Sequence, residues 1–479
     1  MNIFKPLSKN EKYLKDKLSS SDLQFSAIKV GKYSGLIVFV KDIVDKTQIG
    51  ELIIKPLLDF NGNLCEEDLS VSILAPEKKC VYHLPDCIKE VVNGNAILIV
   101  DGLNVAFSLG VIKVEKRAIT EPPTATVIKG PREGFVESLP VNISLMRRRI
   151  KSPDLTFENA CVLGKYTNTP ITLCYIKGVA DNDLVKKLKD RLNSIEIDGV
   201  LDSSYIAKFL GEHKTSLFKQ VGNTEKPDVL TSKIMEGRVA IFVEGSPIAI
   251  TVPYLLIEDF QSPSDYYNSP YTATVSRLIR LFSVILSIML PAFFVSAELF
   301  HLQLIPLSFL ITIVNSIKGI PLSPSYEMFF TILIFEILNE TSVRMPKYVG
   351  MVVSIVGGLV LGETAVTAGV ISAPTLMIVA LSGICLYTVP ELEKNFSLIR
   401  LIFLTIGGVI GVYGLVLASV ILIVYLVSFE NYSTPLFAPF SPLITKDLKD
   451  SIYRGFIFNK NSKPFSIRSK QKGGLGVDK

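Results

Sequence analysis

The distribution of apolar and charged positions divides the chain into two parts. Five runs in the last third contain no Asp, Glu, Lys, Arg or His: Leu281–Ala297, Leu302–Ile317, Val349–Gly362, Thr364–Pro390 and Leu401–Ser428. Such runs are typical of helices in a lipid bilayer. Residues 1–276 contain no apolar run of membrane length. The pattern predicts a water-exposed N-terminal region followed by a helical membrane domain at residues 277–430.

Charge follows the same division. The chain has 50 Lys+Arg and 45 Asp+Glu, but only eight acidic and seven basic residues lie between Arg277 and Glu430. A hydrocarbon core of about 30 Å requires roughly 20 helical residues. We expect membrane helices at Leu278–Phe300 with a kink at Pro291, at Leu302–Ile317 as a marginal span or half of a hairpin, at Pro346–Ser372, at Ala373–Pro390 and at Leu401–Ser428.

The segment Tyr326–Glu340 is ambiguous because it is apolar except for Glu327, Glu336 and Glu340. It is either an interfacial or re-entrant helix, or a span whose glutamates face protein or water. The Lys-rich N-terminus lacks the apolar segment of a secretory signal, and the tail after Lys446 is basic. Both ends are therefore expected in the cytoplasm, with six spans if Tyr326–Glu340 crosses and four if it and one neighbour do not.

The N-terminal region alternates between strand-like and helix-like patterns. Two pairs of β-rich runs flank turn sequences and predict hairpins: Ala96–Val100 with Val105–Val111, and Val239–Val243 with Ile248–Val252. Their similarity indicates one α/β unit used twice, and chance similarity of two apolar hairpins is the alternative. Other expected elements are strands at Leu36–Val40, Cys161–Leu163 and Ile171–Tyr175, and helices at Thr47–Phe60, Gly134–Ile150, Asp181–Leu192 and Ser203–Leu210.

Helix starts are marked by capping residues, with Asp181 as the N-cap of one helix and Asp202 or Ser203 as that of another. We expect a flexible tail at residues 1–25, α/β subdomains at 26–130 and 131–276, the membrane domain, and a basic cytoplasmic tail at 431–479. A cleft between the two subdomains is a place where a ligand could bind, although no residue identifies one.

A glycine-rich turn and a run of arginines invite a phosphate-binding interpretation: Gly130, Pro131, Arg132, Glu133 and Gly134, with Arg147, Arg148 and Arg149. The spacing of a P-loop is absent, and we favour a turn and helix entry whose arginines pair with local carboxylates. The six cysteines include no C-x-x-C, and the three histidines lack ligand spacing, so no metal or cofactor is expected.

Two membrane helices carry stripes of small residues that allow close helix packing: Gly350, Ser354, Gly358 and Gly362 on one, and Gly407 and Gly411 on the other. A second face of the first helix has Val356, Val360, Glu363 and Thr367 and could line a wet path. Glu363 is the only acidic or basic residue between Lys347 and Glu391. The alternative for Glu363 is a structural role, protonated or hydrogen-bonded inside the bundle.

Many short motifs in one fixed order resemble the A subunits of bacterial spore germinant receptors, the GerA family. They include Gly130–Phe135, Arg147–Ile150, Thr224–Asp228, Gln261–Tyr267, Phe335–Leu338, Arg344–Pro346 and Pro439–Pro442. Thr341-Ser342 and Pro140 depart from the usual pattern of the family at two positions. The resemblance implies a nutrient-sensing subunit of the spore inner membrane that acts with a transporter-like B subunit and a lipoprotein C subunit. In that family, A subunits are thought to oligomerise around an ion-conducting pore.

Two functional hypotheses follow. In the first, the chain is a gated subunit that conducts monovalent cations, with Glu363 attracting the ions and Val356 and Val360 closing the path by dewetting. In the second, it is a non-conducting scaffold that transmits a signal. An enzyme is not expected, because the sequence has no H-E-x-x-H, nucleophile elbow or paired catalytic carboxylates. The basic tail Lys460–Lys479 suits anionic membrane lipid better than nucleic acid.

Overall fold

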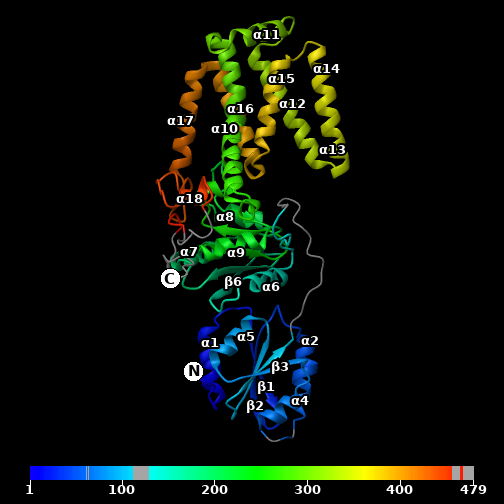
Figure 1. Ribbon diagram of the computed structural model, residues 1–479, viewed down its shortest axis with the longest axis vertical. Coiled ribbons are helices and arrows are strands. Elements are labelled where there is room, and N and C mark those ends of the chain that lie inside the picture. Colours follow the sequence, from blue (N-terminus) through cyan, green and yellow to red (C-terminus); the bar gives the residue numbers. More distant parts are fainter. Residues whose placement is uncertain (61, 63, 112–128, 456–463, 468–479) are drawn as a thin grey trace. The chain divides into compact units, whose positions relative to one another are not determined.

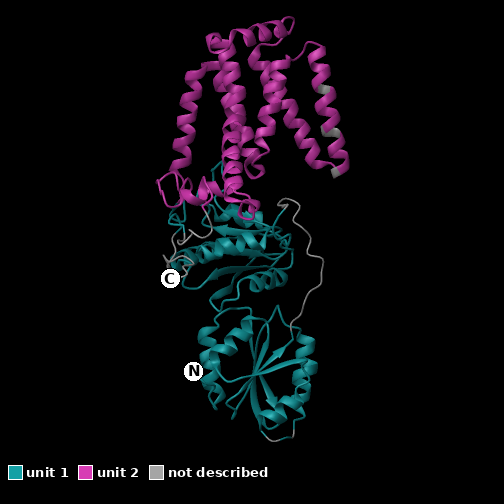
Figure 2. Cartoon of the chain, viewed as in Figure 1, with its two compact units in different colours: residues 1–254, 431–434, 458–479 teal, residues 255–430, 435–457 magenta. Residues whose placement is uncertain are grey.

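The chain folds into two units, here described from a computed structural model (Figure 1). The structure describes residues 1–60, 62, 64–111, 129–455 and 464–467. Unit 1 contains Met1–Tyr254, Asn431–Thr434 and Phe458–Lys479, whereas unit 2 contains Leu255–Glu430 and Pro435–Ile457 (Figure 2). The α/β N-terminal region and the helical C-terminal region predicted from the sequence correspond to these two units.

Unit 1 contains two antiparallel five-stranded sheets. The first has the order β1-β2-β4-β5-β3, with β1 Leu23–Val30, β2 Tyr33–Val40, β3 Glu77–Val81, β4 Ala96–Val100 and β5 Ala106–Gly110. The second has the order β6-β7-β9-β10-β8, with β6 Leu155–Leu163, β7 Thr169–Ile176, β8 Gly222–Thr224, β9 Val239–Val243 and β10 Ala249–Val252. The order of strands is the same in both sheets, and this confirms the predicted repeat.

Helices cover both faces of each sheet. Those of the first half are α1 Leu7–Lys17, α2 Lys46–Gln48, the π-helical η1 Ile49–Ile54, α3 Lys55–Leu58, α4 Glu66–Ser72 and α5 Leu84–Val92; those of the second are α6 Leu139–Arg149, α7 Asn182–Asn193, α8 Ser203–Leu210 and α9 Pro227–Met235. In β2, Ile37 and Phe39 pack into one core while Leu36 and Val38 pack into the other. Burial on both faces explains why the strands are continuous apolar runs rather than alternating ones.

The two halves also share the joint that fixes their first helix, here called the helix–hairpin joint. In the first half, Leu7 N donates to Asp101 Oδ1 in the turn after β4 (2.8 Å), and Gly102 N of the same turn donates to Lys5 O (2.9 Å). In the second half, Glu244 Oε2 accepts from Leu139 N (2.9 Å), and Gly245 N donates to Glu137 O (2.9 Å). Each joint places a carboxylate at the positive end of a helix.

A buried asparagine in each first helix completes the correspondence. Asn10 accepts from Phe4 N (2.9 Å) and donates to Phe4 O (2.6 Å), and Asn142 makes the same two bonds with Val136 at the same distances. Two expectations are thereby corrected. Residues 1–25 are not a flexible tail, because they contain α1 with Leu14 fully buried. The helix expected from Gly134 begins only at Leu139, because Asn142 and Pro140 hold the preceding chain extended.

Other elements agree with the sequence more closely. Asp181 and Asp202 are the N-caps of α7 and α8, and their side chains accept from Asp183 N and Ser204 N, as predicted. Cys161–Leu163 is only the end of the longer strand β6. The helix expected at Thr47–Phe60 is interrupted by η1. The sequence placed the boundary between the halves after residue 130; residues 112–128, which precede it, are outside the described residues.

A buried ion pair connects the two halves of unit 1. Arg147 Nε lies 2.8 Å from Asp22 Oδ2, and Arg147 Nη2 lies 2.9 Å from Asp22 Oδ1, with both residues almost fully buried. Ser21 N donates to Phe157 O beside it (2.8 Å). The pKa of nearby Asp42 is raised, first by burial and then by the negative charge of Asp22. The pair is bidentate, the geometry in which an arginine holds a carboxylate most firmly.

Unit 2 is a helical bundle. Its helices are η2 Leu256–Phe260, η3 Pro263–Tyr266, α10 Pro270–Phe300, η4 Leu302–Leu304, α11 Leu307–Ile317, α12 Pro324–Arg344, α13 Lys347–Val356, the π-helical η5 Gly357–Leu361, α14 Gly362–Thr367, α15 Ala373–Leu386, η6 Pro390–Leu392, α16 Glu393–Ile410, α17 Val412–Ser428 and α18 Leu448–Ser451. The short strands β11 Glu430–Asn431 and β12 Thr434–Pro435 lie at the boundary between the units.

Among the described residues, two helices are long and apolar enough to cross a membrane, Pro270–Phe300 and Tyr348–Thr367. The number is three if Ala373–Leu386 and Pro390–Ile410, which are bent by 108°, form one broken span. The single long helix expected at Leu401–Ser428 is wrong. The chain breaks at Gly411, whose φ of +78° suits glycine and interrupts the helix between α16 and α17.

Candidate functional site

The segment α13–η5–α14 carries the residues predicted to line a path. Val356 and Val360 are about half exposed, and Glu363 and Thr367 are exposed as well. Thr367 Oγ1 donates to the backbone oxygen of Glu363 (2.8 Å). Within the described part of the chain, no hydrogen bond or ion pair of the Glu363 carboxylate is found. These four side chains therefore lie on a face of the helix that the rest of unit 2 does not cover.

The opposite side of this segment packs on its neighbours through glycines. A Cβ added at Gly350 would lie 2.6 Å from Ser342 O of α12, and one at Gly362 would lie 3.3 Å from Leu376 of α15. Gly358 differs from the expectation, since a Cβ there would meet no atom within 4 Å, whereas one at Gly357 would lie 2.7 Å from Leu338. The π-helical turn η5 explains the difference, because its wider turn shifts the packing face by one residue.

The second predicted stripe also lies in close packing. A Cβ added at Gly407 would lie 2.8 Å from Ala292 O of α10, and one at Gly411 would lie 3.1 Å from Phe300. The side chain of Ser354, the remaining member of the first stripe, is outside the described side chains. Small residues thus allow α16 and α10 to approach through their backbones.

A buried polar network that the sequence did not reveal crosses the bundle. Arg400 of α16 is almost fully buried, and its Nη2 lies 2.5 Å from Glu336 Oε1 of α12. Ser397 Oγ donates to the same carboxylate. Arg400 Nη1 donates to Ser382 Oγ of α15 (3.1 Å), which in turn donates to Ser287 O of α10 (2.8 Å). Four helices are therefore joined through one guanidinium.

The glutamates of α12 have three different environments. Glu327 is 1% exposed and its Oε1 accepts from Ser372 N and Ser372 Oγ, both at 2.7 Å, at the start of α15. Glu336 holds Arg400, and Glu340 is exposed and paired with Arg344 (2.6 Å). Of the two alternatives for Tyr326–Glu340, the structure therefore shows a continuous helix in which two glutamates face protein.

At the start of α10, charged groups join three segments of unit 2. Asp265 Oδ1 lies 2.7 Å from Arg280 Nη2, and Asp265 Oδ2 lies 3.1 Å from Arg277 Nε. Arg277 Nη1 also donates to Asp450 O of α18. Burial alone would raise the pKa of Asp265, but the hydrogen bond and charge of Arg280 hold it below its usual value. The cluster fixes α18, η3 and α10 to one another.

The arginines suspected of binding phosphate are paired instead. Arg147 binds Asp22, and Glu133 lies 2.7 Å from Arg149 and 3.7 Å from Arg148. The N-terminus of α6 is already occupied by Glu244. Gly130 has a φ of +120°, and Pro131 O accepts from the buried Lys226 (2.9 Å). This region is a structural turn, as favoured from the sequence.

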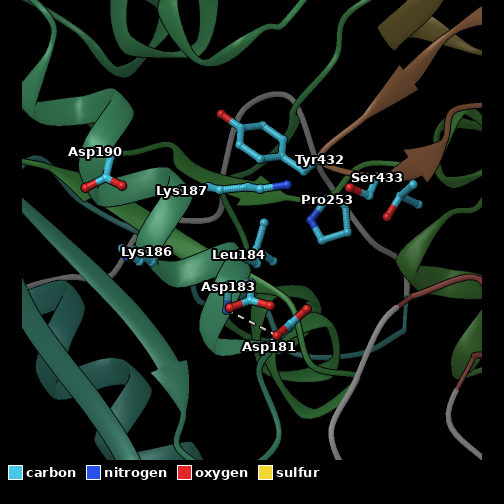
Figure 3. Close-up of a pocket in the computed structure, with 10 residues that line it drawn as sticks. Asp181, Asp183, Leu184, Lys186, Lys187, Asp190, Pro253, Tyr432 and Ser433 are labelled. Carbon is cyan, nitrogen blue, oxygen red and sulfur yellow. Dashed lines mark hydrogen bonds between the residues drawn. The ribbon is translucent and has the colours of Figure 1, made fainter.

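A cavity of about 340 Å³ lies in the second half of unit 1 (Figure 3). It is lined by Asp181, Asp183, Leu184, Lys186, Lys187, Asp190, Pro253, Tyr432, Ser433 and Thr434. The cavity lies within one α/β half, beside α7, and not between the two halves where the sequence suggested a cleft. Its charged side chains belong to the solvent-facing side of α7, and its geometry identifies no ligand.

Comparison with known proteins identifies relatives along almost the whole chain. The family described as Bacillus/Clostridium GerA spore germination protein matches residues 11–466. Spore germination protein KA of Bacillus subtilis (strain 168) is 35% identical over 469 residues, which cover 96% of this chain and 86% of the relative. Spore germination protein GerQA of Bacillus cereus is 33% identical over 441 residues, covering 91% and 88%.

A solved structure is also similar. It is the crystal structure of the N-terminal domain of the A subunit of the Bacillus megaterium spore germinant receptor GerK3. The two chains are 30% identical, and the match covers 53% of this chain and 98% of that one with a TM-score of 0.43.

Proposed function

Since this chain belongs to the GerA family of Bacillus and Clostridium spore germination proteins, we propose that it is the A subunit of a nutrient germinant receptor and that it acts in spore germination. The names of its relatives, which are spore germination proteins of Bacillus species, support this role. The proposed location is the inner membrane of the spore, with both termini in the cytoplasm. The proposed partners are a transporter-like B subunit and a lipoprotein C subunit.

For the membrane domain we propose four to six crossings. The helix Pro270–Phe300 and the segment Tyr348–Thr367 are two of them by length and composition. The remaining crossings would come from α12, the bent pair α15–α16, and the shorter apolar helices α11 and α17. Glutamates of α12 are compatible with a crossing because Glu327 and Glu336 are satisfied by Ser372 and Arg400.

We propose that copies of the chain assemble around a cation path lined by Val356, Val360, Glu363 and Thr367. The single observation that carries this proposal is that Glu363 is exposed on an otherwise apolar helix, α13–η5–α14, which packs on α12 and α15 through its glycines. A carboxylate without a partner is costly against lipid, so a wet path suits it better. In such an assembly, Val356 and Val360 of all copies would form two rings that exclude water from a narrow closed path.

Germinant binding to the receptor would open this path by favouring one of two conformations. A ligand shifts such an equilibrium only as far as it binds one state more tightly than the other. The π-helical turn at Gly357–Leu361 includes Val360 and lies between the two halves of the helix. Conversion between π and α geometry there would rotate Val360 relative to Glu363, which is a local change that could open the constriction.

The first prediction concerns flux through this path. Glu363→Gln is expected to lower cation flux through reconstituted receptor by about fivefold, because a charge interaction of ~1 kcal/mol changes ion occupancy by that factor. Val360→Ala is expected to raise flux in the absence of germinant, because it widens the apolar constriction. The measurement is potassium flux in proteoliposomes with and without germinant.

Matched control variants distinguish these effects on flux from a general loss of folding. Glu340→Gln removes a carboxylate that pairs with Arg344 on the surface of α12, and Val416→Ala removes the same atoms from an exposed valine of α17. Both controls should behave like the unchanged chain. If Glu363→Gln and Val360→Ala also behave like it, this helix is not the path. If the unchanged chain never conducts in any oligomeric state, the non-conducting scaffold is the better assignment.

A further inference from the structure

Helix α8 of unit 1, labelled in Figure 1, has apolar residues on two adjacent sides. Its inner side packs Ile206 and Leu210, both fully buried, into the core of the second half. Its outer side carries Tyr205 and Phe209, which are four residues apart and therefore lie along one stripe, and Leu201 lies just before the helix begins. The side chains of Leu201, Tyr205 and Phe209 are 70%, 40% and 42% exposed.

The position of α8 is fixed by residues that follow the last membrane helix in the chain. Tyr432 Oη donates to Leu210 O at the end of α8 (2.9 Å), and Tyr432 N donates to Glu212 Oε2 (3.1 Å). Arg191 of α7 holds the same end, with Nε donating to Phe209 O (2.9 Å) and Nη2 to Gly211 O (2.6 Å). The outer stripe is therefore carried on a rigid element.

Chain connectivity limits how far this stripe can lie from the bilayer. Tyr432 is only four residues after Ser428, the last residue of α17. Four extended residues span at most about 14 Å. Because Tyr432 is bonded to the last residue of α8, that end of the helix is tethered close to the point where α17 ends. If α17 crosses or enters the bilayer, the stripe is within reach of the lipid headgroups.

The charges around the stripe suit an anionic surface. Lys208 precedes Phe209 in α8 and Lys214 follows the helix; both are exposed, and no ion pair of either lysine is found in the described part of the chain. The two neighbouring acids are already engaged: Glu212 accepts from Tyr432 N, and Asp202 accepts from Ser204 N and Ser246 Oγ. Each lysine near an anionic membrane contributes about 1 kcal/mol of attraction. Tyr and Phe are residues that settle well at the boundary between headgroups and acyl chains.

We propose that the outer side of α8, formed by Tyr205, Lys208 and Phe209, is together with the flanking Leu201 and Lys214 a docking surface for an anionic lipid bilayer. The proposal rests on the membrane location of unit 2 given above, but it does not depend on ion conduction. It gives unit 1 a second attachment to the membrane, which restricts its rotation about the covalent connections. A second copy of the chain is the competing occupant of this surface.

The absence of tryptophan from the chain allows a direct test. Phe209→Trp places a single reporter on the outer stripe, in the full chain reconstituted into vesicles that contain phosphatidylglycerol. Lipids brominated on the acyl chains quench only a tryptophan that is inserted about 5–10 Å into the boundary or deeper. Phe293→Trp on exposed α10 is the reporter for the bilayer, and Tyr82→Trp, an exposed aromatic of the first half, is the reporter for water.

The expected result is blue-shifted emission from Phe209→Trp and a loss of emission on bromination that approaches that of Phe293→Trp, while Tyr82→Trp is unchanged. Adding Lys208→Glu should reduce the quenching in anionic vesicles more than in vesicles of phosphatidylcholine alone. Blue-shifted emission without quenching by brominated lipid would overturn the proposal in favour of a second copy. If Phe209→Trp emits at the same wavelength as Tyr82→Trp, the outer side of α8 is exposed to water, and this result would also overturn the proposal. Failure of Phe293→Trp to be quenched would instead remove the membrane assignment itself.

Discussion

Replacing Arg147 with Met is expected to destabilise unit 1 by about 3–5 kcal/mol, because Asp22 would be left buried and charged without a cation, with only the Ser20 hydroxyl, among the described residues, donating to it. Both oxygens of Asp22 are held by Arg147, at 2.8 and 2.9 Å. The effect should be greatest where the two halves meet. Hydrogen exchange of the full chain in detergent should show loss of protection at the Ser21 amide, which donates to Phe157 O.

The neighbouring arginine provides a control for this prediction. Arg148 is largely exposed and lies 3.7 Å from Glu133, so Arg148→Met should change stability by less than about 0.5 kcal/mol. The double variant Asp22→Asn with Arg147→Met removes both charges and should recover much of the loss. Equal protection in Arg147→Met and Arg148→Met would show that the buried pair does not hold the halves together.

Replacing Arg400 with Met should have a comparable effect on the bundle, again about 3–5 kcal/mol. The substitution leaves Glu336 without its cation and removes the link through Ser382 to Ser287. We expect a lower midpoint of thermal unfolding for unit 2 in detergent and less of the chain in the membrane fraction. The measurement is the unfolding midpoint at constant detergent and protein concentration.

The double variant Glu336→Gln with Arg400→Met is expected to be more stable than Arg400→Met alone, because no buried charge remains. Arg344→Met serves as the matched control, since its partner Glu340 is exposed. A midpoint for Arg400→Met that coincides with that of Arg344→Met would mean that the four helices are held by apolar packing alone.

Local signals in the sequence predicted local structure well. Asp181 and Asp202 identified the starts of two helices because an N-cap depends on neighbouring residues only. The hairpins that begin with the strands Ala96–Val100 and Val239–Val243 identified the repeat, because a turn sequence and a strand pattern each depend on only a few neighbouring positions. Apolar runs likewise located the helical region, since composition alone distinguishes it.

Local signals of this kind could not predict interactions between residues that are far apart in the sequence. Nothing near Arg147 indicates that its partner is Asp22, and Arg400 is a single charge at the edge of an apolar run whose partner Glu336 lies on another helix. The break at Gly411 and the shift of packing from Gly358 to Gly357 depend on backbone geometry that spacing does not encode. The N-terminal helix was missed because the segment is rich in lysine and buries only Asn10 and Leu14.

The helix–hairpin joint has an evolutionary consequence. Asp101 and Glu244 occupy equivalent places in the two halves, so the same constraint is expected at both although the side chains differ in length by one methylene. Drift that exchanges one carboxylate for the other is tolerable at either place, whereas loss of the carboxylate would free the first turn of α1 or of α6. Substitutions that are tolerated at Asp101 should therefore also be tolerated at Glu244, and the reverse.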